Sequence, residues 1–172
     1  MLKDLRHLRD IDPVYNDAGP FGGVTLEALH QDVSRFELPL SAPEGVRRNY
    51  DAIRHAYIFS YFSYDLVTLA TNQLLPCLEL ALRERMQPQS GAGPRGKARG
   101  PNLQKLLSRA AKHGLLSRRH DSLHELRNML QHGNDAIFDP NMFLNLFETV
   151  TELITELYAP SQQAEPTVAD AG

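Results

Sequence analysis

An all-α helical bundle is the fold class that the sequence predicts, and two observations favour it. Apolar residues recur at the three- and four-residue spacing of a helix face in several segments, and Pro and Gly gather between those segments. The 172 residues are 42% hydrophobic, which is enough to bury one sizeable core. We therefore expect one helical domain over residues 46–159, with a lead-in at residues 1–45 and a disordered tail at residues 160–172.

The lead-in is expected to be partly irregular, because it carries four of the eleven prolines. Its segment VTLEALHQDVSRFEL spaces apolar residues as a helix face does and predicts one short amphipathic helix. The chain begins MLKDLRHLRD, where charges alternate and the apolar stretch of a signal peptide is missing. A cytoplasmic location follows as the simplest expectation.

The stretch from Arg47 to Met86 predicts a long central helix, because it contains no Gly and only one Pro, Pro76, which should end or kink the helix near Leu75. Its apolar residues surround the predicted helix instead of forming one stripe; they include Tyr57, Ile58, Phe59, Tyr61, Phe62 and Tyr64. A helix that is apolar all round needs neighbours on all sides. Packing within the bundle plus a contact in a homodimer would provide them.

A membrane span is not favoured, because polar residues interrupt the most apolar part of this stretch at Asp65, Asn72, Gln73 and Glu79. The single cysteine, Cys77, excludes an intrachain disulfide and indicates packing in a reducing compartment. We expect a buried bundle helix and no membrane partner.

Residues 87–101, QPQSGAGPRGKARGP, predict a flexible basic loop with four Gly, three Pro and three bases. The run from Gly91 to Lys97 resembles most of a phosphate-binding P-loop. A P-loop follows a strand and places Ser or Thr after its Lys, whereas here a helix precedes and Ala98 follows. The basic loop is therefore expected to contact nucleic acid and not to hold a nucleoside triphosphate.

Three further helices are predicted after the loop. The segment NLQKLLSRAAKHGLL gives a short helix, and Asp139 with Pro140 should start a closing amphipathic helix that runs to about Tyr158. Between them, one face of a helix ended by Gly133 carries Leu123, Leu126, Met129 and Leu130. The opposite face of that helix carries Arg127, Asn128 and His132.

With its flanking helices, RNMLQH at residues 127–132 resembles the signature of the HEPN superfamily, which is Arg, a polar residue, a few more residues and His near the end of a late helix. The resemblance covers roughly residues 46–159. It implies an all-helical fold and, for many members, a metal-independent endoribonuclease that acts as a homodimer, often as a toxin or antiviral effector. In such a setting a nucleotidyltransferase-like antitoxin is an expected partner. Other members have lost catalysis and only bind RNA or protein.

RNA cleavage by these residues needs neither a metal nor another cofactor. His132 can act as general acid or base near neutral pH, and Arg127 can donate to the nonbridging phosphate oxygens. Asn128 can orient His132 or the substrate. Because Arg127 and His132 lie ~140° apart around a helix, a two-fold dimer would supply two acid–base groups more naturally than one chain.

Charge is distributed unevenly along the chain, although its net value is −3. Between Arg83 and Arg127 there are eleven bases and three acids, so an RNA backbone could be held beside the motif. The residues that we expect to bind RNA are Arg95, Lys97, Arg99, Lys105, Arg109, Lys112, Arg118, Arg119, His124 and Gln131.

Other interpretations remain open for the same residues. His132 could interact only with the last carbonyls of its helix, while Arg127 pairs with an acid. Arg119 and His124 have the same spacing as the motif, and HDSLH at residues 120–124 has the spacing of two zinc ligands but no evident third one. An inactive, HEPN-like binding module is the principal alternative to an enzyme.

Overall fold

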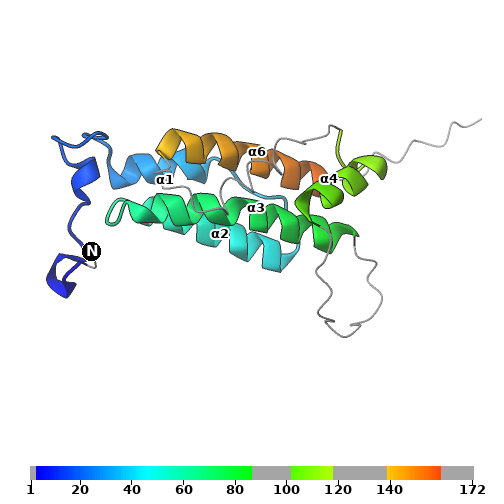
Figure 1. Ribbon diagram of the computed structural model, residues 1–172, viewed down its shortest axis with the longest axis horizontal. Coiled ribbons are helices and arrows are strands. Elements are labelled where there is room, and N and C mark those ends of the chain that lie inside the picture. The colour runs from blue at the N-terminus through cyan, green and yellow to red at the C-terminus, as the bar shows by residue number, and fades with distance from the viewer. Residues whose placement is uncertain (1–2, 87–101, 118–138, 160–172) are drawn as a thin grey trace, which may run out of the picture.

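A computed structural model describes residues 3–86, 102–117 and 139–159, and these parts form helices without any strand (Figure 1). The helices are α1 (Leu26–Ser34), α2 (Glu44–Phe59), α3 (Asp65–Met86), α4 (Leu103–Lys112) and α6 (Pro140–Tyr158), preceded by the short 3-10 turns η1 (Leu5–His7) and η2 (Pro13–Tyr15). The all-α prediction is confirmed. The basic loop, the motif helix and the tail lie outside the described residues, and a HEPN-like arrangement with a dimer stays a prediction.

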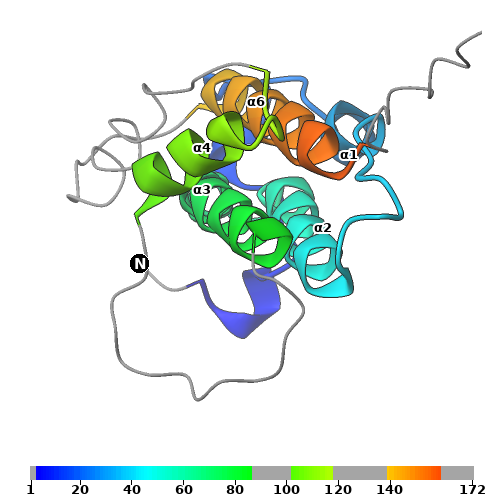
Figure 2. The ribbon, with the colours of Figure 1, turned by 90° about the vertical axis from the view of Figure 1, so that its right-hand side faces the viewer.

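Helix α3 is the centre of the bundle, because it packs against α2, α4 and α6, while α1 packs on α2 (Figure 2). Its buried residues surround most of the helix, including Val67, Leu74, Leu78 and Leu82, which are at most 1% exposed. Burying one such side chain stabilises the fold by about 1.5–3 kcal/mol. The all-round apolar pattern of this region is therefore satisfied only in part within the described chain, since Phe59 and Leu69 remain 53% and 60% exposed.

An aromatic layer joins α2 to α6. The ring of Tyr57 stacks on Phe143 at 4.3 Å, and the ring of Tyr50 stacks on Phe147 at 5.0 Å. Their hydroxyls also have partners, since Tyr57 donates to Asp32 of α1 at 2.9 Å and Tyr50 lies 2.8 Å from the Thr151 hydroxyl. A buried phenol without a hydrogen bond would destabilise the fold, so these pairs fix the register of the packed helices.

The long central helix predicted from Arg47 to Met86 is wrong in one respect, because residues 60–64 divide it into α2 and α3. The chain turns there through successive bonds to carbonyls three residues earlier, such as Phe62 N–H to Phe59 O at 3.0 Å. A single helix of this length would leave apolar side chains on every face without neighbours, whereas two antiparallel helices bury them against each other. Two serines at the turn, Ser60 and Ser63, were the available sequence indication.

Pro76 does not end the helix, since α3 continues from Asp65 through it to Met86. Proline has no N–H to donate to the carbonyl of Asn72, four residues earlier. Asn72 is exposed and Pro76 is half-buried, so both lie toward the outer side of α3, where water can replace the lost bond. The chain breaks its helix instead at residues 60–64, twelve to sixteen residues before Pro76, and a kink of α3 at Pro76 stays a prediction.

Helix α6 begins as predicted. The Asp139 side chain accepts a hydrogen bond from Met142 N–H at 2.9 Å, and Pro140 occupies the first turn. Helix α4 ends at Lys112, and Gly114, just after the C-cap, has a φ of 67° that allows Leu115 N–H to reach Ala110 O at 2.9 Å. Both ends follow from residue types that are visible in the sequence.

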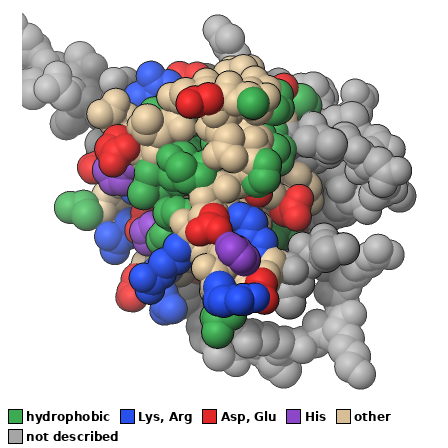
Figure 3. All heavy atoms as spheres, turned by 90° about the vertical axis from the view of Figure 1, so that its left-hand side faces the viewer, with side chains coloured by type: hydrophobic (Ala, Val, Ile, Leu, Met, Phe, Trp, Pro, Cys, Tyr) green, Lys and Arg blue, Asp and Glu red, His purple; other side chains and the backbone are tan. Residues whose placement is uncertain are grey.

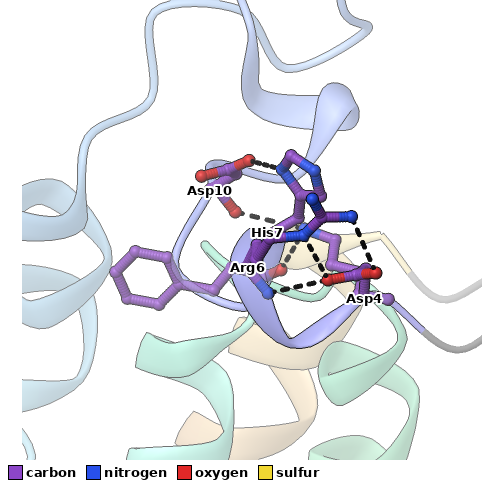
Figure 4. A network of polar contacts seen from close by, with 6 residues as sticks. Asp4, Arg6, His7 and Asp10 are labelled. Carbon is purple, nitrogen blue, oxygen red and sulfur yellow. Dashed lines mark hydrogen bonds and ion pairs between the residues drawn. The ribbon is translucent and has the colours of Figure 1, made fainter.

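The lead-in contains the one amphipathic helix that was predicted, α1, with Leu29 and Val33 buried in the common core. Before it, η1 has no buried residue and is held by polar contacts (Figure 4). His7 pairs with Asp10 at 2.7 Å, and Lys3 Nζ donates to the Phe62 carbonyl at 2.7 Å. The lead-in therefore packs on the turn that joins α2 to α3.

Candidate nucleic-acid interface

The described part of the predicted interface is a basic stripe on α4, formed by Lys105, Arg109 and Lys112. All three side chains are exposed and are four and three residues apart, so they share one face of the helix. The opposite face buries Leu103, Leu106, Leu107 and Ala110, as the helical spacing of these apolar residues requires. Packing of α4 on α3 thus fixes the direction in which the basic stripe points.

The start of α4 is set by Asn102, whose side chain accepts a hydrogen bond from Lys105 N–H at 3.1 Å. Helix α4 contains no acidic residue. Within the described parts of the chain, none of the three cations of the basic stripe forms an ion pair. Arg109 and Lys112 lie in the last turn, where the helix dipole favours positive charge. Among the described residues, the basic stripe therefore offers a polyanion three cations that no acid compensates.

Ser117 and Asp139, the residues directly before and after residues 118–138, are both held on α6 by hydrogen bonds. Ser117 N–H donates to a Glu156 carboxylate oxygen at 2.5 Å, near the C-terminal end of α6. Asp139 caps the opposite end of the same helix. Glu156 lies seventeen positions after Asp139, so these two anchor points are about 26 Å apart along α6.

The other predicted site residues lie outside the described residues. These are the catalytic candidates Arg127, Asn128 and His132, and the RNA-binding candidates Arg95, Lys97, Arg99, Arg118, Arg119, His124 and Gln131. The HDSLH segment lies outside them as well. Only Lys105, Arg109 and Lys112 are brought together by the described fold, and the geometry of the motif stays a prediction.

His113 was not among the predicted RNA-binding residues, although it directly follows the basic stripe. It is exposed and occupies the C-cap of α4, where its N–H donates to Arg109 O at 3.0 Å. The sequence KHG after the last apolar residue indicates a helix end with added basic character. His113 is therefore a further exposed candidate for RNA contact, next in sequence after the basic stripe.

Cys77 is fully buried in α3, and burial raises the pKa of its thiol to about 12. The thiol stays protonated near neutral pH, so it is no nucleophile. Among the described residues, no three His, Cys, Asp or Glu side chains converge as a metal site would require. None of the described helices is long and apolar enough to cross a bilayer.

No family model, curated protein or solved structure matches the chain. The resemblance to the HEPN superfamily therefore depends on the residues of RNMLQH and on the order of the helices around them.

Proposed function

We propose that this protein is a metal-independent endoribonuclease of the HEPN type that acts as a homodimer in the cytoplasm, in a toxin or antiviral defence setting. The observation that carries the proposal is the grouping of Arg127, Asn128 and His132 in RNMLQH, directly before Gly133, which is expected to end the helix. In a toxin setting the partner would be an antitoxin such as a nucleotidyltransferase-like protein.

The basic stripe supports RNA as the substrate. Its three cations are exposed, lie on one face of α4 and have no ion pair among the described residues. Contacts of this kind to phosphates position a nucleic acid without reading its sequence. Arg118 follows the described chain directly after Ser117, so the positive charge continues in sequence toward the motif.

The chemistry assigns one task to each motif residue. A ribose 2′-hydroxyl attacks the adjacent phosphorus while His132 of one copy takes its proton. Arg127 donates hydrogen bonds to the nonbridging oxygens, where negative charge accumulates. The P–O5′ bond breaks as His132 of the second copy protonates the leaving oxygen. The products are a 2′,3′-cyclic phosphate and a 5′-hydroxyl, and Asn128 orients His132 or the substrate.

A cleavage assay in EDTA tests the proposal. The purified full chain is expected to cut RNA and leave 2′,3′-cyclic phosphate ends, which a cyclic phosphodiesterase and mass spectrometry identify. Arg127→Ala should lower the rate ~10² to 10⁴-fold, and His132→Ala should lower it by at least that much, because in the dimer it removes both the base and the acid. The matched control is His124→Ala, which removes an imidazole from the same segment and should retain more activity.

Equal rates for the wild type and His132→Ala would show that His132 is not the acid–base group. Light scattering across a dilution series checks the dimer. A monomer that cuts RNA at full rate would contradict the two-copy chemistry.

The second candidate function is an inactive HEPN-like module that binds RNA or protein. The basic stripe favours it equally, because the stripe could hold RNA without any reaction. RNA binding by a chain that does not cleave any RNA would decide for this alternative.

A further inference from the structure

A pocket of about 480 Å³ opens between the lead-in and the turn that joins α2 to α3. This volume lies within the range of small-molecule sites. Tyr15 and Tyr61 form its aromatic wall, with ring centroids 5.9 Å apart, while Asn16, Asp17 and Thr25 supply polar atoms. Figure 3 views this end of the bundle, where hydrophobic side chains lie among acidic, basic and His side chains.

Hydrogen bonds within the lead-in, and one between the lead-in and the end of α2, hold the wall of the pocket. Gly19 N–H donates to Asn16 O at 2.6 Å, and Phe21 N–H donates to Val14 O at 3.1 Å. The Tyr15 hydroxyl lies 3.0 Å from the Ser60 hydroxyl, which ties the wall to the end of α2. A wall fixed in this way needs little ordering when a ligand enters.

The polar groups of the pocket accept and donate hydrogen bonds but offer no cation. None of the described residues that line it is Lys or Arg, so phosphate and carboxylate have no charged partner there. Asp17 only accepts hydrogen bonds, whereas the amide of Asn16 both accepts and donates. Within the described residues neither side chain is already used in a hydrogen bond, and both are exposed. At Thr25 the first turn of α1 begins, where helix N–H groups point outward.

These features fit a planar ring that carries hydrogen-bond donors and acceptors on its edge. We propose that the pocket binds a guanine base, which stacks on the ring of Tyr61. The two adjacent N–H donors on the Watson–Crick edge of guanine match the two oxygens of Asp17, and no other standard base offers that pair. Unpaired bases of single-stranded RNA are recognised by such stacking and edge contacts.

The location of the pocket connects it to the proposed cleavage, and the choice of RNA as the source of the base rests on that proposed function. The Tyr15 hydroxyl lies 3.0 Å from that of Ser60, whose N–H donates to Tyr57 O at 3.1 Å. The Tyr57 ring in turn stacks on Phe143 in the first turn of α6. The pocket is therefore close to the start of α6. His132 precedes Asp139 by seven residues, which limits their separation to about 25 Å. A strand of a few nucleotides can span that distance.

Binding of guanosine and adenosine to the full chain, measured by calorimetry or NMR titration, tests the base site. Guanosine should bind at least ~5-fold more tightly than adenosine. Asp17→Asn should weaken guanosine ~10-fold, because the amide replaces one of the two acceptor oxygens by an NH₂ donor, and Tyr61→Leu should weaken both nucleosides ~5-fold or more. Asp17 is exposed, so its variant is expected to fold. The matched control Glu148→Gln exchanges an exposed carboxylate on α6 and should change nothing.

Two RNA pentamers, one with a central guanine and one with adenines only, then distinguish the source of the base. They are bound to the His132→Ala chain to prevent cutting. If the guanine pentamer binds more tightly than free guanosine 5′-monophosphate, and if Asp17→Asn abolishes this difference in affinity, RNA is the source of the base. Tighter binding of the mononucleotide overturns the RNA assignment. Guanosine binding that is unchanged in Asp17→Asn, or absent from the wild type, overturns the base site. Neither readout depends on cleavage, so a failure of the proposed reaction would be seen separately.

Discussion

Asp12 shows at the residue scale how one side chain decides where a helix ends. One carboxylate oxygen accepts from Val14 N–H at 3.1 Å, and the other accepts from Tyr64 N–H at 3.0 Å. Its own N–H donates to Tyr61 O at 2.8 Å. The bonds with Tyr61 and Tyr64 satisfy backbone groups that the α2–α3 turn leaves without helical partners, and the bond with Val14 caps η2. The partners are about fifty residues apart in sequence, so no local pattern could have predicted the turn from Asp12.

Gly19 gives a prediction at the same scale. A Cβ atom at this position would lie 2.3 Å from the backbone oxygen of Val14, which cannot move without distorting the pocket wall. Gly19→Ala should therefore lower the free energy of unfolding by about 1–3 kcal/mol. Gly45→Ala is the matched control, since its Cβ would meet no atom within 4 Å and Ala favours the helix by up to ~1 kcal/mol. Urea unfolding measures both, and equal midpoints would contradict the close packing at Gly19.

At the scale of elements, the sequence predicted those parts of the fold that local residue types determine. The start of α6 at Asp139 and Pro140 and the helical spacing of α1 and α4 are confirmed. The division of α2 from α3 was missed, because it depends on packing between distant segments and on Asp12. Of the candidate site, only the basic stripe is described, and its direction follows from the apolar face of α4. The pocket was missed, because it forms between the lead-in and the α2–α3 turn.

The basic stripe carries the prediction at this scale. Replacing Lys105, Arg109 and Lys112 by Gln should weaken RNA binding and reduce the salt slope by up to about three phosphate contacts. The fold should be retained, because the three side chains are exposed and unpaired among the described residues. Replacing Arg95, Lys97 and Arg99 of the loop by Gln tests the other part of the predicted interface, and it should weaken RNA binding in the same way. Unchanged affinity and salt slope in the α4 variant would exclude α4 from the RNA interface.

For the whole molecule, buried tyrosines are the groups that link distant helices. Tyr158 of α6 donates to the carbonyl of Ala81 in α3 at 2.9 Å, and its own carbonyl accepts from Ser41 at 2.8 Å. Tyr57 joins α2 to α1 and α6, and Tyr15 joins the lead-in to α2. A tyrosine hydroxyl that loses its proton can no longer donate its hydrogen bond to a neighbouring helix. The stability of the bundle should therefore depend on the ionisation of these tyrosines.

The resulting prediction is a loss of stability at alkaline pH. Burial raises the pKa of Tyr64 and Tyr158 to about 12, and burial raises that of Tyr50 and Tyr57 further. Tyrosine in the unfolded chain ionises near 10. A folded pKa above the unfolded one means that the unfolded state loses protons first as the pH rises. Stability from these groups is therefore complete below pH ~10 and is lost as the pH rises through 12.

Urea unfolding at pH 8, 10 and 11, followed by circular dichroism, should show a decreasing free energy of unfolding only above pH ~10. Tyrosinate absorbance near 295 nm should rise together with the loss of helix, because the buried hydroxyls ionise when the bundle opens. Tyr158→Phe is the matched variant, since it keeps the ring and removes one ionisable hydroxyl, and it should flatten the pH dependence while losing the bond to Ala81. Ionisation of every tyrosine near pH 10 with the helices intact would contradict the buried packing that joins α1, α2, α3 and α6.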